Sequence, residues 1–212
     1  FAILGGVFGA EYFPLPLLPS MILWINLVTD GGPAVALATD PADVDVMDRP
    51  PRNPKEGILH GMGRFIVLSF VLQSIGTVLV FCLEYYVWPS EVWLLPGGVV
   101  DEVARELVYR EATTSAFVQA ALFELFVVWN CRSEKRSVWR MGRDAFKNKF
   151  FVVVTVFSIF ITVAIVYVPL TQQLFHLFPL SLRDLAIVAG VASWGLFVFP
   201  EFTMNKPLWK WK

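Results

Sequence analysis

Three oxygen-bearing side chains stand close together inside an apolar stretch near the start of the chain. Asn26, Thr29 and Asp30 lie at positions i, i+3 and i+4, so in a helix an amide oxygen, a hydroxyl and a carboxylate share one face. An acid within an apolar run is costly in hydrocarbon unless it is paired, protonated or bound to a cation. All three are hard oxygen donors, which suit calcium, magnesium, manganese or sodium and not a thiophilic metal. The pattern predicts a cation site.

Two glycines and a proline follow these residues directly, at Gly31, Gly32 and Pro33. Because proline removes an amide donor and clashes with the preceding turn, we expect the helix to unwind here and to present backbone carbonyls to the same site. Broken helices near the middle of the membrane form ion sites in transporters. The alternative is structural: Asp30 hydrogen-bonds a neighbouring helix, and the glycines allow the two helices to pack closely.

A second acid, Glu124, lies inside another apolar segment, 115–126. It is a candidate to complete the cation site, because two carboxylates with neutral oxygens offset a divalent charge. It is equally compatible with a protonated carboxyl, a proton carrier or a structural hydrogen bond. For Gln73, in a third apolar segment, we expect hydrogen bonding between helices. The predicted metal ligands are therefore Asn26, Thr29, Asp30 and Glu124, with no catalytic and no cofactor-binding residue in the chain.

The elements that must position these residues are membrane helices. Of the 212 residues 56% are hydrophobic and 17% charged, whereas roughly a quarter of an ordinary soluble domain is charged. The apolar runs approach the length of roughly 20 residues that crosses a bilayer, without the alternation of a barrel. We predict an all-α fold, a polytopic transmembrane helical bundle with five full helices and a truncated first one, in a single domain over 1–212. The expected spans are 1–10 (partial), 17–38, 65–88, 113–130, 150–169 and 185–202.

The opening run, 1–10, is too short to span and has no initiator Met, which predicts the tail of a truncated helix and a longer parent protein. Positive charge indicates the orientation. All but three of the 17 Lys and Arg residues fall in connectors on one side, the exceptions being Arg105, Arg110 and Arg183. By the positive-inside rule that side, with the C-terminus, is cytoplasmic. The outer connector, 89–112, is acidic, and a short surface helix is expected at 99–111. We expect no nucleic-acid partner and no disulfide between Cys82 and Cys131, which fall near opposite faces.

The segment Pro19–Ala34 resembles the sixth transmembrane helix of P-type cation-transporting ATPases of the calcium-pump branch. The resemblance continues through Asp43–Arg52, which is similar to that family's loop between helices six and seven. Phe123–Phe126 and Asn130–Ser137 are similar to helix eight and the following loop of prokaryotic members. The resemblance covers essentially the whole chain. It implies that the chain is the family's C-terminal membrane domain, from late helix five to helix ten.

The resemblance implies which residues bind the transported ion. Asn26, Thr29 and Asp30 fall on the family's helix-six cation ligands, and Glu124 falls on its helix-eight carboxylate. Asn at position 26 and Thr at position 29 are similar to the residues of calcium pumps. Sodium/potassium pumps carry Asp at the position of Asn26, and manganese-tolerant pumps usually carry Met at the position of Thr29. The acids Asp43, Asp45 and Asp48, with the basic residues of that face, fall where the family's loop contacts the phosphorylation domain. They are expected to couple ATP hydrolysis to the gate.

The family's phosphorylation, actuator and nucleotide-binding motifs do not occur in this sequence, so the chain alone has no ATPase machinery. We expect calcium as the transported ion, with ATP and magnesium bound only by cytoplasmic domains outside the chain. The expected partners are the lipid bilayer, the N-terminal helices and the phosphorylation domain of the same pump, in a prokaryotic plasma membrane. The alternatives are a free-standing channel or a structural or regulatory subunit, or a family member that pumps manganese or sodium.

Overall fold

The computed structural model describes residues 14–43, 46–48, 57, 59–87 and 102–204. These residues form helices and turns, with no strand among them, which confirms the predicted all-α bundle. The predicted partial helix at 1–10 lies outside the described residues. The α-helices are α2 (Pro19–Trp24), α3 (Gly31–Leu37), α4 (Gly63–Cys82), α5 (Glu102–Val127), α6 (Val138–Met141), α7 (Lys149–Ala164), α8 (Pro169–Phe175), α9 (Leu182–Ala192) and α10 (Pro200–Thr203).

Several α-helices continue directly into wider or tighter turns. Ile25–Asp30 and Leu83–Val87 are π-helical, and Val46–Asp48, Asn130–Arg132, Gly142–Phe146 and Ser193–Phe197 are 3₁₀ turns. With these extensions, Pro19–Leu37, Gly63–Val87 and Ala104–Arg132 are long and apolar enough to cross a bilayer. A fourth candidate span combines Val138–Phe146 with α7, across a bend of 107°. Helix α9 has 11 residues and reaches Phe197 only through its 3₁₀ turn.

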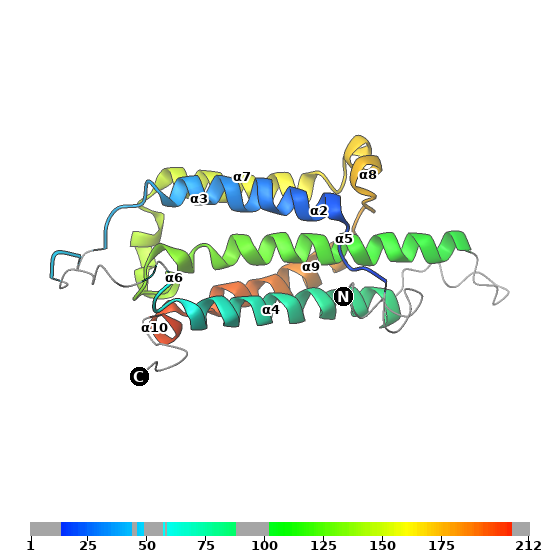
Figure 1. Cartoon of the computed structure of the whole chain (residues 1–212). Coiled ribbons are helices and arrows are strands. Elements are labelled where there is room, and N and C mark those ends of the chain that lie inside the picture. The colour runs from blue at the N-terminus through cyan, green and yellow to red at the C-terminus, as the bar shows by residue number, and fades with distance from the viewer. Residues whose placement is uncertain (1–13, 44–45, 49–56, 58, 88–101, 205–212) are drawn as a thin grey trace.

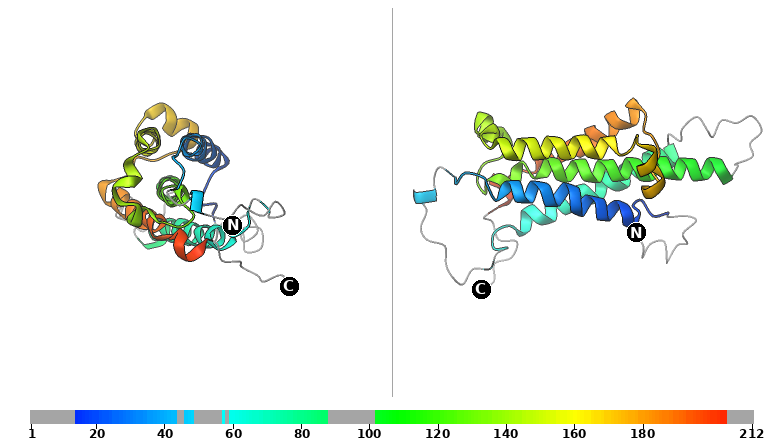
Figure 2. Two further views of the ribbon diagram at one scale, coloured as in Figure 1. Left: turned by 90° about the vertical axis from the view of Figure 1, so that its left-hand side faces the viewer. Right: turned by 90° about the horizontal axis from the view of Figure 1, so that it is seen from above.

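Helix α5 is the central element of the bundle. Seen end-on it lies in the middle with the other helices around it (Figure 2), and every residue from Glu111 to Phe123 is buried. In the side view α3 and α7 run side by side above α5, while α4 and α9 lie below it (Figure 1). A residue on α5 can therefore contact both the layer that holds Thr29 and the layer that holds Gln73.

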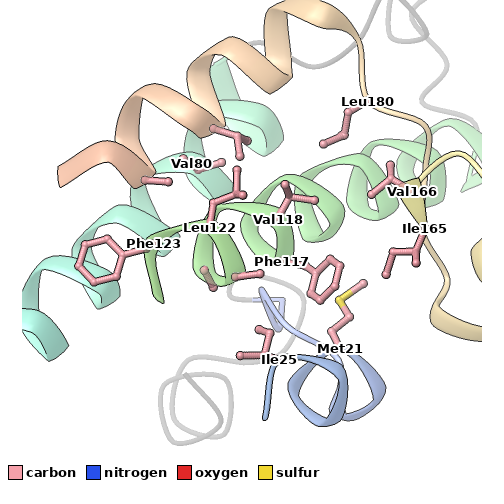
Figure 3. Packing of buried hydrophobic residues seen from close by; sticks show 14 of the residues in the cluster. Met21, Ile25, Val80, Phe117, Val118, Leu122, Phe123, Ile165, Val166 and Leu180 are labelled. Carbon is pink, nitrogen blue, oxygen red and sulfur yellow. The ribbon is translucent and has the colours of Figure 1, made fainter. Parts of the chain in front are cut away.

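The core forms where the faces of these helices meet. Met21 at the start of the first span and Phe117 on α5 are completely buried and point toward each other, with Ile165 beside them (Figure 3). Val80 of α4 and Val188 of α9 contribute to the same cluster. Many side chains on the outer faces of α4 and α7, such as Phe70 and Phe160, are exposed and apolar. A bundle with an apolar exterior is the arrangement expected for helices in lipid.

The helix expected at 99–111 is present from Glu102 onward, but it is not a short surface helix of its own. From Glu102 onward the chain is already α5, which continues without a break through residue 113, where the span was predicted to begin. Because this stretch contains acids and arginines, the sequence indicated a connector helix separate from the span at 113–130. Ala104, Val108 and Ala112 lie on one face of its first turns and are buried, so packing against neighbouring helices outweighs the polar residues on the other faces.

The expected unwinding at Gly31–Pro33 is wrong. The chain stays helical from Pro19 to Leu37, and the irregularity is the π-helical segment Ile25–Asp30 just before the glycines. In a regular α-helix the ring of Pro33 would clash with the carbonyl of Thr29, four residues earlier. A wider turn before the proline relieves such a clash without opening the helix. Single π-helical turns of this kind are frequent at functional sites.

Candidate functional site

Two of the four predicted ligands meet in the interior of the bundle. Thr29, which is 3% exposed, lies in the π-helical segment, and its Oγ1 donates to Glu124 Oε2 on α5 at 3.0 Å. The same hydroxyl lies 2.6 Å from the Ile25 carbonyl, its other acceptor. The helix direction explains the meeting, since Ile25 and Thr29 lie one turn apart on the face of the first span that is buried against α5.

A third residue completes the surroundings of the Glu124 carboxylate. Gln73 of α4 donates through Nε2 to Glu124 Oε1 at 2.8 Å, so each carboxylate oxygen has a donor from a different helix. The expected interhelical hydrogen bond of Gln73 is confirmed, and its partner is the site acid itself. One turn further along α4, Thr77 donates to Gln119 Oε1 on α5 at 2.8 Å. This second polar pair was not recognised in the sequence, although Gln73 and Thr77 have the spacing of one helical face.

The structure does not bring Asn26 and Asp30 to Glu124 by hydrogen bonds. Both side chains are exposed on the face of the first span that the rest of the described bundle leaves uncovered. They lie one turn apart on this face, beside Thr29, which is buried. The site therefore has an inner half, made by Thr29, Glu124 and Gln73, and an outer half, made by Asn26 and Asp30.

Helix α7 supports the irregular segment from the other side. A Cβ added to Gly32 would lie 3.1 Å from Val154 Cγ1 and 3.7 Å from Ser158 Oγ, so the glycine permits close approach of the two helices. Ser158 donates to the Val28 carbonyl at 3.3 Å. The residue five positions after Val28, which would donate in a π-helix, is Pro33 and has no N–H. The Val28 carbonyl thus bonds to α7 and is not directed to the predicted cation site.

At the end of the bundle reached by α3 and α5, an aspartate and an arginine form a buried ion pair. Arg132 binds Asp40 with two hydrogen bonds, from Nε to Oδ2 and from Nη2 to Oδ1, each 2.9 Å long. It also donates to the carbonyl of Ala145, and its guanidinium lies 4.8 Å from the ring centre of Phe151. Asn148 donates to Asp40 Oδ1 at 2.9 Å, while its own Oδ1 accepts the Phe151 N–H and caps α7.

The acids predicted to face a phosphorylation domain have different surroundings. Asp43 accepts a hydrogen bond from Ser133 at 3.0 Å and lies 3.6 Å from an Arg136 nitrogen, so it is bound to the connector after α5. Asp48 is exposed. Asp45 lies outside the described residues.

The side chains of the described site carry hard oxygen donors, the type predicted to bind a cation. They offer two carboxylates, Asp30 and Glu124, with hydroxyl and amide oxygens. Within the described ranges, no group of three or more His, Cys, Asp or Glu side chains is placed to hold a metal ion. His60 and His176 are exposed. Cys82 and Cys131 are free thiols at opposite ends of the bundle.

Comparison with known proteins gives one family. The family model described as "Cation transporting ATPase, C-terminus" matches residues 14–202. A calcium-transporting ATPase of Bacillus subtilis is 36% identical over 186 residues, which are 87% of this chain and 19% of that protein. Calcium-transporting ATPase 1 of Yarrowia lipolytica is 33% identical over 84% of this chain and 17% of its own length.

A mammalian protein gives a similar match. Calcium-transporting ATPase type 2C member 2 of Rattus norvegicus is 31% identical over 192 residues, which are 89% of this chain and 18% of that protein. The chain therefore spans less than a fifth of the length of these relatives.

Proposed function

The chain belongs to the cation-transporting ATPase family, of which it matches the C-terminal region, and on that premise we propose that it supplies part of the cation site of an ATP-driven calcium pump. It is an integral membrane protein with membrane-spanning helices. We assign the ATPase reaction to domains outside this chain. The role proposed for its own residues is to hold the ion between helices and to change its surroundings during the transport cycle.

The observation that carries the proposal is the Thr29–Glu124 hydrogen bond. The two residues are 95 positions apart in the sequence and were each predicted as ligands, and the bond joins them in the interior of the bundle. Hydroxyl and carboxylate oxygens are ligands that calcium accepts in its flexible coordination sphere. Gln73 orients the carboxylate from the other side, as residues that hydrogen-bond to metal ligands commonly do.

Asn26 and Asp30, on the uncovered face of the first span, are the other two proposed ligands. Polar side chains at membrane depth are stable only where they meet a partner, water or an ion. We assign the surface beside them to the remaining helices of the pump, which would bring further oxygen ligands. When those helices move, the ligand set opens toward one side of the membrane or the other, which is a shift between two populated states.

Calcium is the proposed cargo because the relatives are named as calcium-transporting ATPases and because Asn26 and Thr29 match the calcium-pump pattern. Manganese or sodium are the other outcomes of the ion test below. We assign ATP and magnesium to cytoplasmic domains beyond this chain. We further propose that the C-terminus is cytoplasmic, for which the basic connectors are the support, and that the membrane is a prokaryotic plasma membrane, for which the similarity to the Bacillus protein is the support.

The test is phosphorylation of the intact parent protein from ATP, measured as acid-stable phosphoenzyme with and without calcium. We compare the wild type with Asp30→Asn and Glu124→Gln, which remove charge with little change in volume. The matched control is Glu106→Gln, an exposed carboxylate on the same helix as Glu124. Calcium-dependent labelling of the wild type and the control, lost in Asp30→Asn and reduced in Glu124→Gln, is expected.

Equal labelling of all four proteins would show that Asp30 and Glu124 are scaffold and would refute the proposed site. The cargo is identified by competition, in which manganese or sodium replaces calcium in the same assay. Labelling that follows manganese or sodium in place of calcium would keep the site and refute calcium as the ion.

A further inference from the structure

Three polar residues at the end of the bundle, Asp40, Arg132 and Asn148, tie together the ends of three helices. Asp40 follows α3, Arg132 follows α5 and Asn148 precedes α7. None of the three is a predicted cation ligand. We propose that this group, here called the polar clamp, is a positioning device that fixes α3 against α5 and so keeps Thr29 at Glu124. The inference rests on the proposed function for its transport readout.

Burial and charge make the clamp more than a surface ion pair. The Arg132 side chain is 2% exposed and that of Asp40 is 12% exposed. Surface ion pairs contribute little, whereas removal of one partner from a buried pair leaves an uncompensated charge and is strongly destabilising. The two parallel hydrogen bonds also fix direction, because a guanidinium fork fits a carboxylate in one plane. A lysine cannot reproduce that geometry.

The clamp and the cation site connect the same pair of helices at two levels. The first span and α5 run toward the same end of the bundle (Figure 1). Thr29 lies eight residues before the end of α3 at Leu37, and Glu124 lies three residues before the end of α5 at Val127. Asp40 and Arg132 follow these two ends, so the clamp joins the helices at a level beyond the Thr29–Glu124 bond. Two parallel helices joined at two such levels cannot slide past each other without breaking one of the links.

Asn148 adds the third helix to this arrangement. Its Nδ2 lies 3.3 Å from the Ala36 carbonyl in the last turn of α3, in addition to its contact with Asp40. Helix α7 then packs along α3, where Gly32 permits close contact with Val154. The clamp thus holds α3 between α5 and α7 at the level where the first span ends. Loss of the clamp frees that end while the apolar core of the bundle remains.

Titration of the intact parent protein tests the proposal, with calcium-dependent phosphoenzyme as the readout. Asp40→Asn and Arg132→Gln are each expected to raise the calcium concentration for half-maximal labelling about tenfold, within the usual range of coupling between sites. The double variant is expected to resemble the single variants, because they break one interaction. Arg132→Lys should fall between Arg132→Gln and the wild type. Arg105→Gln, an exposed arginine on the first turns of α5, is the matched control and should leave the titration unchanged.

Hydrogen exchange provides a readout that does not depend on transport. In Arg132→Gln the amides of 36–40 should exchange faster, while those of 116–123 in the middle of α5 stay protected. Unchanged exchange at 36–40, or an unchanged calcium titration in a variant with native protection of α5, would overturn the clamp. If α5 also loses protection in Arg132→Gln, that variant has lost more than the clamp. The same two measurements, exchange at 36–40 and the calcium titration, are then made on Arg132→Lys, and unchanged values there would overturn the clamp. A wild-type parent without cation-dependent labelling would refute the proposed function instead, and exchange would still decide on the clamp.

Discussion

Replacement of Gly195 by alanine should destabilise the bundle next to the proposed cation site. Gly195 lies in the 3₁₀ turn after α9, buried against α5. An added Cβ would lie 2.8 Å from the Phe123 carbonyl oxygen, 3.0 Å from Val127 Cγ2 and 3.1 Å from Val127 N. Two of these three atoms belong to backbone, which cannot turn aside as a flexible side chain does. The methyl group must therefore push the turn away from α5, at the residue next to Glu124.

The expected loss in the free energy of unfolding follows from comparison with a second glycine, Gly190. Insertion of a methylene-sized group into a packed interior costs ~1–3 kcal/mol. Alanine also gains up to about 1 kcal/mol over glycine in a helix. At Gly190, on α9, an added Cβ would meet nothing within 4 Å, so Gly190→Ala has the higher helix propensity of alanine without a clash. Both variants share this gain in propensity, so it largely cancels when they are compared. Gly195→Ala should therefore be less stable than Gly190→Ala by ~1–3 kcal/mol.

The assay is reversible unfolding of the intact protein in mixed micelles with increasing SDS, followed by loss of helical circular dichroism. Wild type, Gly190→Ala and Gly195→Ala are compared at equal detergent. Gly190→Ala should unfold at or slightly above the wild-type SDS fraction, and Gly195→Ala clearly below it. Equal midpoints for the two alanine variants would refute the close contact between the 195 turn and the backbone of α5.

Three further substitutions test single contacts. Asn130→Ala removes a buried amide that donates to the Gly195 carbonyl at 3.2 Å, and should cost ~1–3 kcal/mol in the same unfolding assay; a wild-type midpoint would contradict this. Gln73→Leu deprives Glu124 of one donor, and should weaken calcium-dependent labelling about tenfold; an unchanged titration would make the bond scaffold only. Asn148→Ser retains a capping hydroxyl for α7, but the side chain is too short to reach Asp40. The amides of 36–40 should therefore exchange faster while those of α7 stay protected. Loss of protection in α7 would mean that only the cap matters.

The fold class could be predicted because it follows from composition and from the lengths of the apolar runs. The position of the start of α5 could not. Glu106 and Arg110 look like connector residues in the sequence, yet the helix that carries them buries Val108 and Ala112 against its neighbours. Tertiary packing therefore determines where α5 begins, because local helix propensity is only a weak prior. The proline at 33 was correctly read as a disturbance, but its structural effect is a widened turn and not an open break.

The candidate site was predicted to a similar extent. Thr29 and Glu124 were chosen for their oxygen ligands and their unusual place in apolar segments, and the structure brings them together. That Gln73 would bond a helix neighbour followed from its type, but the identity of that neighbour required the packing of α4 on α5. Asp40 and Arg132 looked like ordinary connector charges. Their pairing across 92 residues depends on where two helices end in space, which no local pattern encodes.

The π-helical segment Ile25–Asp30 has a consequence for rotation of the first span. It accommodates one more residue in its turn than an α-helix does, and each α-helical residue turns the chain by about 100°. Conversion of this turn to regular α-helix would therefore twist the two halves of the span against each other by a comparable angle. With the end at Leu37 tied to α5 and α7, the half from Pro19 to Trp24 would have to rotate. The segment could thus act as a point of rotation within the first span, and it contains the residues proposed to bind the ion.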